Sequence, residues 1–249
     1  MKFQSVVKQT GVTLIELMLA LAISSILMLG VSSIYISSKR GYKIQDNLAR
    51  QQENSRFSLQ ILMRDLRMAG YPKTTIKNPI MTAASETADG GGTAPDMITV
   101  QYEASVDCLG QPLTLAANAC ADDASKICAI NKYYIATDAN NNKNLYCLGN
   151  GGANPDVIAE NVTNLQIEYG VDNNTTGTAN GYFSWNDLTT NDIPNIVSIR
   201  FALLSQTPND VKKVDISKNY LLLGQTIATN DKRYHQVYTN TVLLRNRMQ

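Results

Sequence analysis

Glu16 is the residue whose type and position most clearly call for an explanation. It is a carboxylate that directly precedes residues 17–38, a run without any charged side chain. A carboxylate near the apolar part of a membrane-spanning helix costs roughly 2.5–3.5 kcal/mol on insertion scales, and more without a partner. Either Glu16 lies at the membrane surface and reaches headgroups or water, or it pairs with a cation inside an assembly of helices.

The four cysteines are separated by 11, 7 and 18 residues and contain no C-x-x-C unit suited to zinc or redox chemistry. Structural disulfides are therefore expected, and they indicate an oxidising compartment such as the periplasm. Three pairings are possible. A hairpin that turns near residues 140–141 would place Cys147 opposite residue 134, so a directly opposed Cys128–Cys147 bridge requires a register shift. We therefore favour Cys108–Cys147 with Cys120–Cys128.

The remaining polar residues do not form a catalytic or metal-binding pattern. His235 is the one histidine, which leaves few ways to build a hydrolytic triad or an imidazole-rich metal site, and we expect it on the surface before the last strand. Residues 138–142 and 172–177 offer carboxylate and amide oxygens that suit calcium, but neither run follows EF-hand spacing. We interpret both as polar turns and expect no metal, no cofactor and no enzymatic activity.

Composition predicts one domain with an appendage. The chain has 249 residues, of which 44% are hydrophobic and 17% are charged, enough for one sizeable core. Its net charge of +1 gives no reason to expect a nucleic-acid partner. Residues 1–70 carry nine basic and four acidic side chains, whereas residues 71–249 carry thirteen and seventeen. A basic stalk therefore precedes an acidic head.

Residues 17–38 predict a membrane-spanning helix, because 22 helical residues extend about 33 Å. The plausible processing site, the Gly11–Val12 bond, comes before this run, unlike the cleavage site of a secretory signal peptide. Basic residues flank the run on both sides, so the positive-inside rule does not orient it. The expected disulfides orient the helix instead, because they place the residues that follow it in the periplasm.

The helical pattern continues to Ala69 in amphipathic form and ends at the Gly70-Tyr71-Pro72 stop. Gly30 and Gly41 are its expected weak points. Apolar and small residues at spacings of three, four or seven define one stripe, and two further residues widen it. The stripe comprises Ile44, Leu48, Ser55, Leu59, Leu62, Leu66 and Ala69, with Phe57 and Ile61 beside it. We expect residues 55–69 to pack on the head.

The head predicts an antiparallel sheet after a long loop over residues 71–95. Expected strands cover residues 97–103, 130–137, 144–148, 165–169, 196–204 and 237–245, with residues 138–143 as a hairpin loop. Packing one face of this sheet on the Phe57, Ile61, Leu62 and Leu66 side of the helix would close a single core. The expected fold class is α+β, with a long N-terminal helix against the sheet.

The segment Gly11, Val12-Thr13-Leu14-Ile15-Glu16-Leu17 and the apolar run after it resemble the class III leader of type IV prepilins and pseudopilins. The resemblance implies that a prepilin peptidase cuts after Gly11 and that the new N-terminus at Val12 is methylated. It also implies that Glu16 neutralises the N-terminal ammonium of a neighbouring subunit. The domains would then be a leader at 1–11, a helix at 12–70 with residues 17–38 in the membrane, and a periplasmic head at 71–249.

Later motifs narrow the resemblance. Asp65-Leu66-Arg67-Met68-Ala69-Gly70-Tyr71, Asp107-Cys108-Leu109-Gly110, Leu145-Tyr146-Cys147 and residues 241–247 look like PilW-type minor pilins. Such a subunit joins other minor pilins in a priming complex near the pilus tip, from which the pilus of major subunits grows. Its expected partners are these pilins, the inner-membrane assembly platform and a tip adhesin.

The resemblance also implies a cellular location and leaves two alternative functions. The chain would first lie in the bacterial inner membrane and later in the pilus at the cell surface, in support of twitching motility, adhesion or DNA uptake. A minor pseudopilin of a type II secretion system would share the leader, Glu16 and the head architecture. A membrane-anchored periplasmic enzyme or binding protein is the other rival, and no catalytic constellation favours it.

Overall fold

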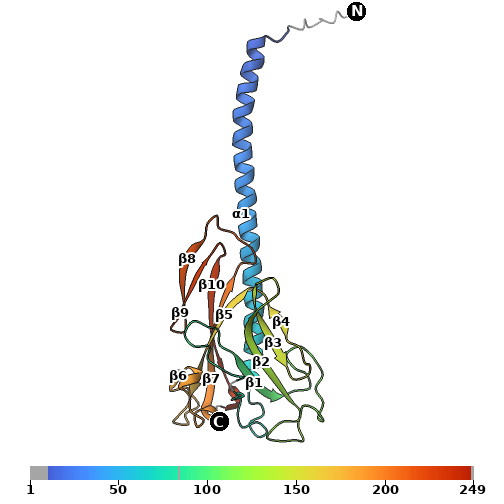
Figure 1. Cartoon of the computed structure of the whole chain (residues 1–249), viewed down its shortest axis with the longest axis vertical. Helices are drawn as coiled ribbons and strands as arrows, with labels where there is room; N and C mark the ends of the chain where they lie inside the picture. The colour runs from blue at the N-terminus through green and yellow to red at the C-terminus, as the bar shows by residue number, and fades with distance from the viewer. Residues whose placement is uncertain (1–10, 84, 248–249) are drawn as a thin grey trace, which may run out of the picture. The chain divides into compact units, whose positions relative to one another are not determined.

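The computed structural model describes residues 11–83 and 85–247. Apart from Gly11, the expected leader lies outside the described residues. The chain divides into two compact units, Met1–Asp46 and Asn47–Gln249. The first unit contains the start of helix α1 (Leu14–Met68), and the second contains the end of α1 and all the strands (Figure 1). The expected helix is confirmed to within two residues at each end, and it continues through Gly30 and Gly41.

Two four-stranded antiparallel sheets and one hairpin make up the head. The first sheet has the order β1-β2-β3-β4, and the second has the order β10-β7-β5-β6. Their bounds are β1 (Ile98–Glu103), β2 (Cys128–Thr137), β3 (Lys143–Gly149), β4 (Asp156–Ala159), β5 (Val162–Val171), β6 (Gly181–Phe183), β7 (Ile196–Gln206) and β10 (His235–Leu243). Among the described residues, strands β8 (Ile216–Leu222) and β9 (Gln225–Asp231) pair only with each other. Short 3-10 helices cover Trp185–Asp187, Ile193–Asn195 and Arg245–Arg247.

The expectation of one sheet is therefore wrong, although all six expected strands are present. The four strands that were not expected are β4, β6, β8 and β9. β4 and β6 have only four and three residues, too few for an alternating pattern. β8 is polar and exposed over most of its length, with an alternation too weak to recognise. The predicted β2–β3 hairpin is confirmed, and Tyr133 rather than residue 134 faces Cys147.

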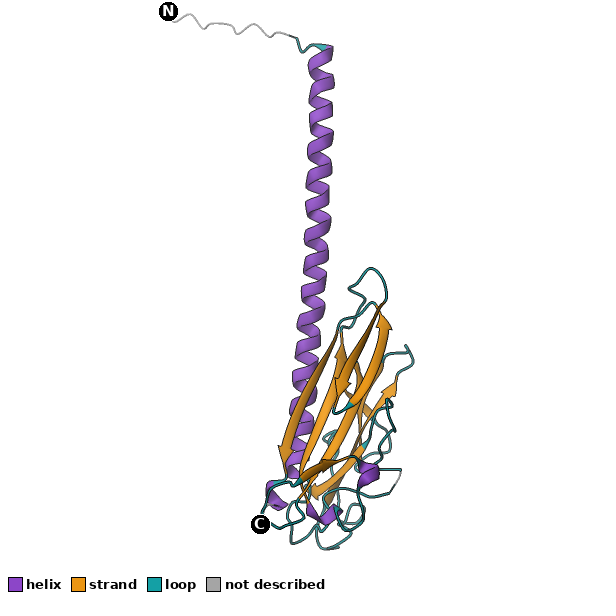
Figure 2. Ribbon diagram, turned by 90° about the vertical axis from the view of Figure 1, so that its left-hand side faces the viewer, coloured by secondary structure: helices purple, strands orange, loops and turns teal. Residues whose placement is uncertain are grey.

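The core lies between the two sheets and the second half of α1 (Figures 1 and 2). β7 is buried on both faces: Phe201 and Leu203 enter the main core, whereas Ala202 and Leu204 join a smaller cluster with Leu222 of β8 and Ile227 of β9. The β8–β9 hairpin thus covers the outer face of the second sheet. The expected single core that joins helix and sheet is confirmed, with this satellite cluster added.

The buried face of α1 is more polar than expected. Leu62, Leu66 and Ala69 are buried as predicted, but Phe57 is 54% exposed and does not pack on the head. The polar side chains buried on this face are Asn47, Gln51, Ser55, Ser58 and Asp65, of which the expected stripe included Ser55 alone. The buried stripe is therefore rotated toward the amide and hydroxyl side chains. Gln51 Nε2 donates to the carbonyl of Ser205 in the head at 3.0 Å, whereas the Ser55 and Ser58 hydroxyls donate to carbonyls of α1 itself.

The end of α1 depends on Gly70, the predicted stop. Gly70 has φ +75°, the left-handed conformation that commonly terminates helices, and its N–H donates to the Gln101 carbonyl at 2.8 Å. A Cβ placed on it would lie 2.8 Å from Arg247 Nε and 3.0 Å from the Pro79 side chain. Arg247 is buried there, and its Nη2 donates to the carbonyls of Ile76 and Lys77. The peptide Tyr71–Pro72 is cis.

Candidate functional site

The start of α1 is held by a side-chain cap that leaves the two preceding residues outside the helix. Thr13 Oγ1 accepts the N–H of Glu16 at 3.3 Å, and the Thr13 carbonyl accepts the N–H of Leu17 at 3.2 Å. Thr13 is thus the N-cap and Glu16 the third helical residue, the spacing of a capping box. Gly11 and Val12 are exposed and have no secondary structure, and nothing lies within 4 Å of a Cβ built on Gly11. The bond between them is sterically accessible.

Glu16 lies in the first turn of α1, exposed and beside the helix N-terminus. The unpaired N–H groups at that end carry a partial positive charge, which favours a carboxylate there. The structure therefore brings Gly11, Val12 and Glu16, the three residues expected to act in processing and docking, into one short segment. A cation approaching from another chain would meet Glu16 without rearrangement of the helix.

The apolar surface that follows is exposed on all sides of α1. Every large hydrophobic side chain from Leu14 to Ile36 is between 51% and 78% exposed. Helix α1 is the one helix among the described residues that is long and apolar enough to cross a membrane, with a mean hydropathy of 2.4 over its most apolar window. A helix that is apolar on all sides needs lipid or other helices around it.

Two family models match this chain. The model described as Type IV Pilus-assembly protein W (PilW) matches residues 132–246, and the prokaryotic N-terminal methylation motif matches residues 7–32. The chain is a type IV pilin of the PilW type. The pilin is therefore anchored in the inner membrane by its apolar helix and is later part of the pilus. Its family is one of structural subunits rather than enzymes.

Comparison with individual proteins adds less. No curated protein matches the pilin. Among solved structures, the pilin is similar to the Type IV-like pilin TTHA1219 from Thermus thermophilus, with 13% identity and a TM-score of 0.42 over 82% of this chain and 96% of that one. The α+β fold class expected from the sequence is confirmed by the elements of the pilin itself.

A buried carboxylate joins α1 to the first sheet, and the sequence analysis did not single it out. Asp65 is 1% exposed, and its Oδ2 accepts hydrogen bonds from the Tyr133 hydroxyl and from Asn131 Nδ2, the latter at 2.9 Å. Asn131 Nδ2 also lies 3.0 Å from the Tyr102 hydroxyl oxygen. Burial, and then the Asp65 charge, raise the pKa of both tyrosines, so both stay protonated. The sequence signal that could have identified Asp65 is a carboxylate three residues after Leu62, on the helix face that was expected to be buried.

The partners of Asp65 extend this connection to the disulfides. Asn131 Oδ1 accepts the N–H of Cys108 at 3.0 Å, and Cys108 is bonded to Cys147 of β3. The second bridge joins Cys120 and Cys128, so the pairs are those that the sequence analysis favoured. Their Cα atoms are 6.6 and 4.9 Å apart, respectively. The loop between β1 and β2 is thereby attached to the sheet at both ends.

The two acidic turns use their carboxylates internally. Asp138 accepts the N–H groups of Asn140 and Asn142, and Asp172 accepts those of Asn174, Thr176 and Gly177 at 2.6–3.2 Å. Their oxygens are therefore engaged in shaping the turns, as the polar-turn interpretation requires. Within residues 11–83 and 85–247, no group of three or more His, Cys, Asp or Glu side chains could hold a metal ion.

His235 differs from its expected position. It begins β10, and its side chain is 2% exposed, so the expectation of a surface histidine before the last strand is wrong. Its Nε2 lies 2.8 Å from Asp231 Oδ2, and its ring packs against Tyr220 with the centroids 5.6 Å apart. The β8–β9 hairpin, which the sequence analysis did not predict, is what buries this imidazole.

Proposed function

We propose that this pilin is a minor subunit that helps to prime assembly of a type IV pilus and sits at or near the tip. The match of residues 132–246 to the PilW family carries this proposal, because those residues form most of the head. The filament would then support twitching motility, adhesion or DNA uptake. Other minor pilins and the major pilin would bind through the N-terminal helix, alongside the assembly platform and a tip adhesin.

Processing would occur at the Gly11–Val12 bond. The exposed, non-helical backbone before the Thr13 cap supports this assignment, because a peptidase needs a substrate bond free of helical hydrogen bonds. Cleavage would make Val12 the first mature residue, one position before the N-cap, and methylation would follow at its amino group. Residues 1–11 would be the discarded leader.

Glu16 would bind the N-terminal ammonium of a neighbouring subunit. Its exposure and its place one turn from Val12 support this role, because staggered helices would bring one subunit's amine to another's carboxylate. In a bundle of apolar helices an unpaired charge is costly, so the ion pair would favour one axial register over others. The positive helix end would also limit repulsion of the carboxylate before docking.

Deletion of the gene in a strain without pilus retraction tests the priming role. We expect surface filaments counted by electron microscopy to fall sharply and to return on complementation. Unchanged filament numbers would contradict priming. A loss of protein secretion with normal filaments would instead favour a pseudopilin of a type II secretion system, which shares the leader and Glu16.

Substitutions in the N-terminal segment test the residue roles. Glu16→Ala should be processed normally yet enter filaments poorly, whereas Glu53→Ala, which removes an exposed acid further along the same helix, should enter normally. Gly11→Ala should be cleaved better than Gly11→Val, as measured by mass spectrometry of the mature N-terminus. Normal incorporation of Glu16→Ala would exclude the docking role. Equal cleavage of the wild type and of both Gly11 variants would exclude Gly11 as the recognised residue.

A further inference from the structure

The β8–β9 hairpin has an open edge. It is a separate two-stranded sheet, joined by the two-residue turn Leu223-Gly224 with φ +45° and +85°. In such a hairpin the residues that flank the turn, Leu222 and Gln225, form a hydrogen-bonded pair, and bonded and non-bonded pairs alternate from there. Thr226, Ala228 and Asn230 of β9 therefore direct their N–H and C=O groups away from β8. No further strand pairs with them in the described part of the chain.

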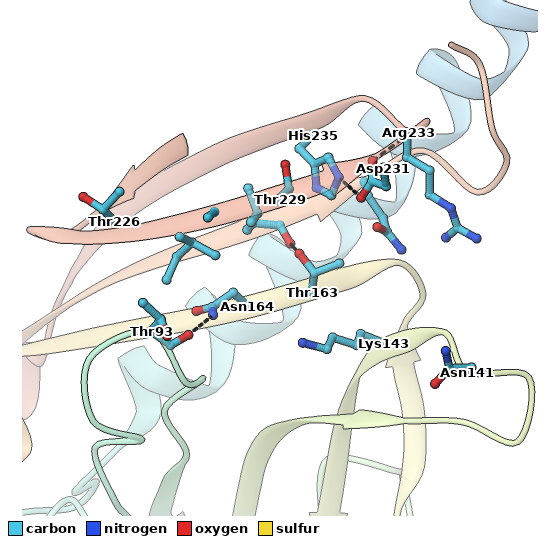
Figure 3. Close-up of a pocket in the computed structure, with 14 residues that line it drawn as sticks. Thr93, Asn141, Lys143, Thr163, Asn164, Thr226, Thr229, Asp231, Arg233 and His235 are labelled. Atoms are coloured by element: carbon cyan, nitrogen blue, oxygen red, sulfur yellow. Dashed lines mark hydrogen bonds and ion pairs between the residues drawn. The ribbon is translucent and has the colours of Figure 1, made fainter. Parts of the chain in front are cut away.

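A cavity of about 640 Å³ lies against this edge (Figure 3). Four consecutive residues of β9, from Thr226 to Thr229, line it. Since residues on one face of a strand alternate, a run of consecutive lining residues means that the strand meets the cavity with its edge. Thr163 and Asn164 of β5 form the opposite side. The volume is within the range of about 300–1,000 Å³ that is usual for ligand sites.

The lining is polar and includes two cations. Lys143 extends alongside β5, across the cavity from β9 (Figure 3), and has no ion-pair partner within the described residues. Arg233 closes one end, with Nη2 3.4 Å from Asn142 Oδ1 and Nε 3.8 Å from Asp210 Oδ1. His235 is part of the wall, and its buried Nδ1 lacks a hydrogen-bond partner in the described structure. The carboxylate that lines the cavity, Asp231, already interacts with His235 Nε2 and accepts the N–H of Arg233.

Nothing in β9 protects the edge. The strand contains no proline, and its pairing with β8 runs without a bulge over seven residues. Natural proteins usually block an edge with one of these devices or cover it, because unpaired N–H and C=O groups are a template for another strand. Repeated main-chain donors and acceptors at two-residue spacing fit an extended polypeptide better than a compact ligand.

We propose that the free edge of β9 binds an extended segment of a neighbouring pilus subunit, which adds a strand to the hairpin and directs an acidic side chain toward Lys143 and Arg233. The segment pairs with Thr226, Ala228 and Asn230. The polar walls select hydroxyl, amide and carboxylate side chains. This inference rests on the proposed role in the pilus, because that role supplies the neighbouring subunit.

Site-specific photocrosslinking in piliated cells tests the contact. A photoreactive residue replaces Thr226 at the free edge of β9 or its cross-strand partner Leu221, which faces the other edge of the hairpin. We expect adducts from position 226 whose mass spectra map to one continuous stretch of another pilus subunit that contains Asp or Glu, and none from position 221. Equal adducts from both positions, scattered attachment sites, or adducts with lipid or a small metabolite would overturn the proposal.

Matched proline variants test the main-chain pairing. Ala228→Pro removes an N–H that faces the cavity, whereas Asn219→Pro, at the residue directly opposite on β8, removes one that faces away. We expect Ala228→Pro to lower the crosslink yield from position 226 about tenfold, the effect of one lost hydrogen bond, and Asn219→Pro to change it less than twofold. Equal losses would indicate that the hairpin itself is damaged and would refute edge pairing.

Charge variants keep the inference testable if the proline variants fold poorly. Lys143→Glu should reduce the crosslink severalfold, whereas Lys213→Glu, an exposed lysine that does not line the cavity, should not. Equal yields from both would exclude an acidic occupant. Gene deletion separates the two proposals: a loss of filaments without any position-226 crosslink would retain the priming role and reject the β9 contact. A specific crosslink from position 226 with normal filament numbers after gene deletion would retain the β9 contact and reject the priming role.

Discussion

Replacement of Asp65 by alanine should be among the most destabilising changes in the head. The substitution leaves the Tyr133 hydroxyl without its acceptor and removes one of the two acceptors of Asn131 Nδ2, which keeps the Tyr102 hydroxyl; Tyr133 and Asn131 are both 0% exposed. A hydrogen bond to a charged group contributes about 1.5–3 kcal/mol, and Asp65→Ala removes two of them, from Tyr133 and from Asn131. Arg64 adds little, because its side chain is 66% exposed although its Nε lies 3.1 Å from Asp65 Oδ1.

We therefore expect Asp65→Ala to lower the free energy of unfolding by about 3–6 kcal/mol. For a head of this size, that corresponds to a fall in Tm of roughly 6–24 °C. Urea titration of the full chain in detergent micelles would measure it, with Trp185, the one tryptophan, as the fluorescent reporter. Trp185 is suitable because its ring packs 5.2 Å from Tyr169 in the head.

A double-mutant cycle separates this interaction from general damage. Tyr133→Phe alone should cost about 1.5–3 kcal/mol, since it removes a hydrogen bond to a charged group, and it should cost much less once Asp65 is absent. Arg64→Ala is the matched control and should cost under about 1 kcal/mol. Additive effects of Asp65→Ala and Tyr133→Phe, or a cost of Asp65→Ala below about 1 kcal/mol, would refute the reasoning.

Three further changes have defined outcomes. Gly70→Ala should lower the free energy of unfolding by about 1–2 kcal/mol from the left-handed backbone alone, and a neutral result in urea would contradict the helix-end geometry. Burial raises the pKa of Asp96 to about 6, so the native state binds this proton more tightly than the unfolded chain. The resulting stabilisation is complete below the unfolded pKa and is lost as pH rises through about 6. Relative to Asp96→Asn, the wild type should gain roughly 2.4 kcal/mol between pH 7 and pH 4, and parallel pH profiles would exclude the shift. Loss of the Cys108–Cys147 bridge, which closes a loop of 39 residues, should lower the free energy of unfolding by about 4 kcal/mol. Loss of the Cys120–Cys128 bridge, which closes a loop of 8 residues, should lower it by about 2.5 kcal/mol. The reverse order of the two losses in thermal unfolding would contradict the loop-entropy explanation.

The sequence predicts the elements that have strong local signals. The helix, its stop at Gly70 and the β2–β3 hairpin depend on periodicity, a left-handed glycine and a short polar loop, all of which act between near neighbours. The segment from Gly11 to Glu16 is recognisable for the same reason. Such features need no knowledge of distant contacts.

The features that were missed depend on contacts between distant residues. Asp65 is buried because Asn131 and Tyr133 come to it from β2, 66 and 68 residues later, and its own neighbourhood reads as an ordinary helix end. His235 was expected at the surface because the hairpin that covers it is itself polar and exposed. The division of the strands into two sheets depends on which of them pair, and strand composition alone carries little of that information.

The polar stripe on the second half of α1 has a consequence for the order of synthesis. Gln51 bonds the carbonyl of Ser205, which lies 154 residues later in the chain. At roughly 5–20 residues per second, the ribosome delivers that partner about 8–30 s after Gln51. During this interval Asn47 and Gln51 have no head to contact, and water must satisfy their amides, whereas the Ser55 and Ser58 hydroxyls bond carbonyls of the helix itself. A fully apolar stripe would enter the lipid behind the spanning segment during this interval. The amide and hydroxyl groups instead keep the second half of the nascent helix outside the membrane until the head has been synthesised and can pack on it.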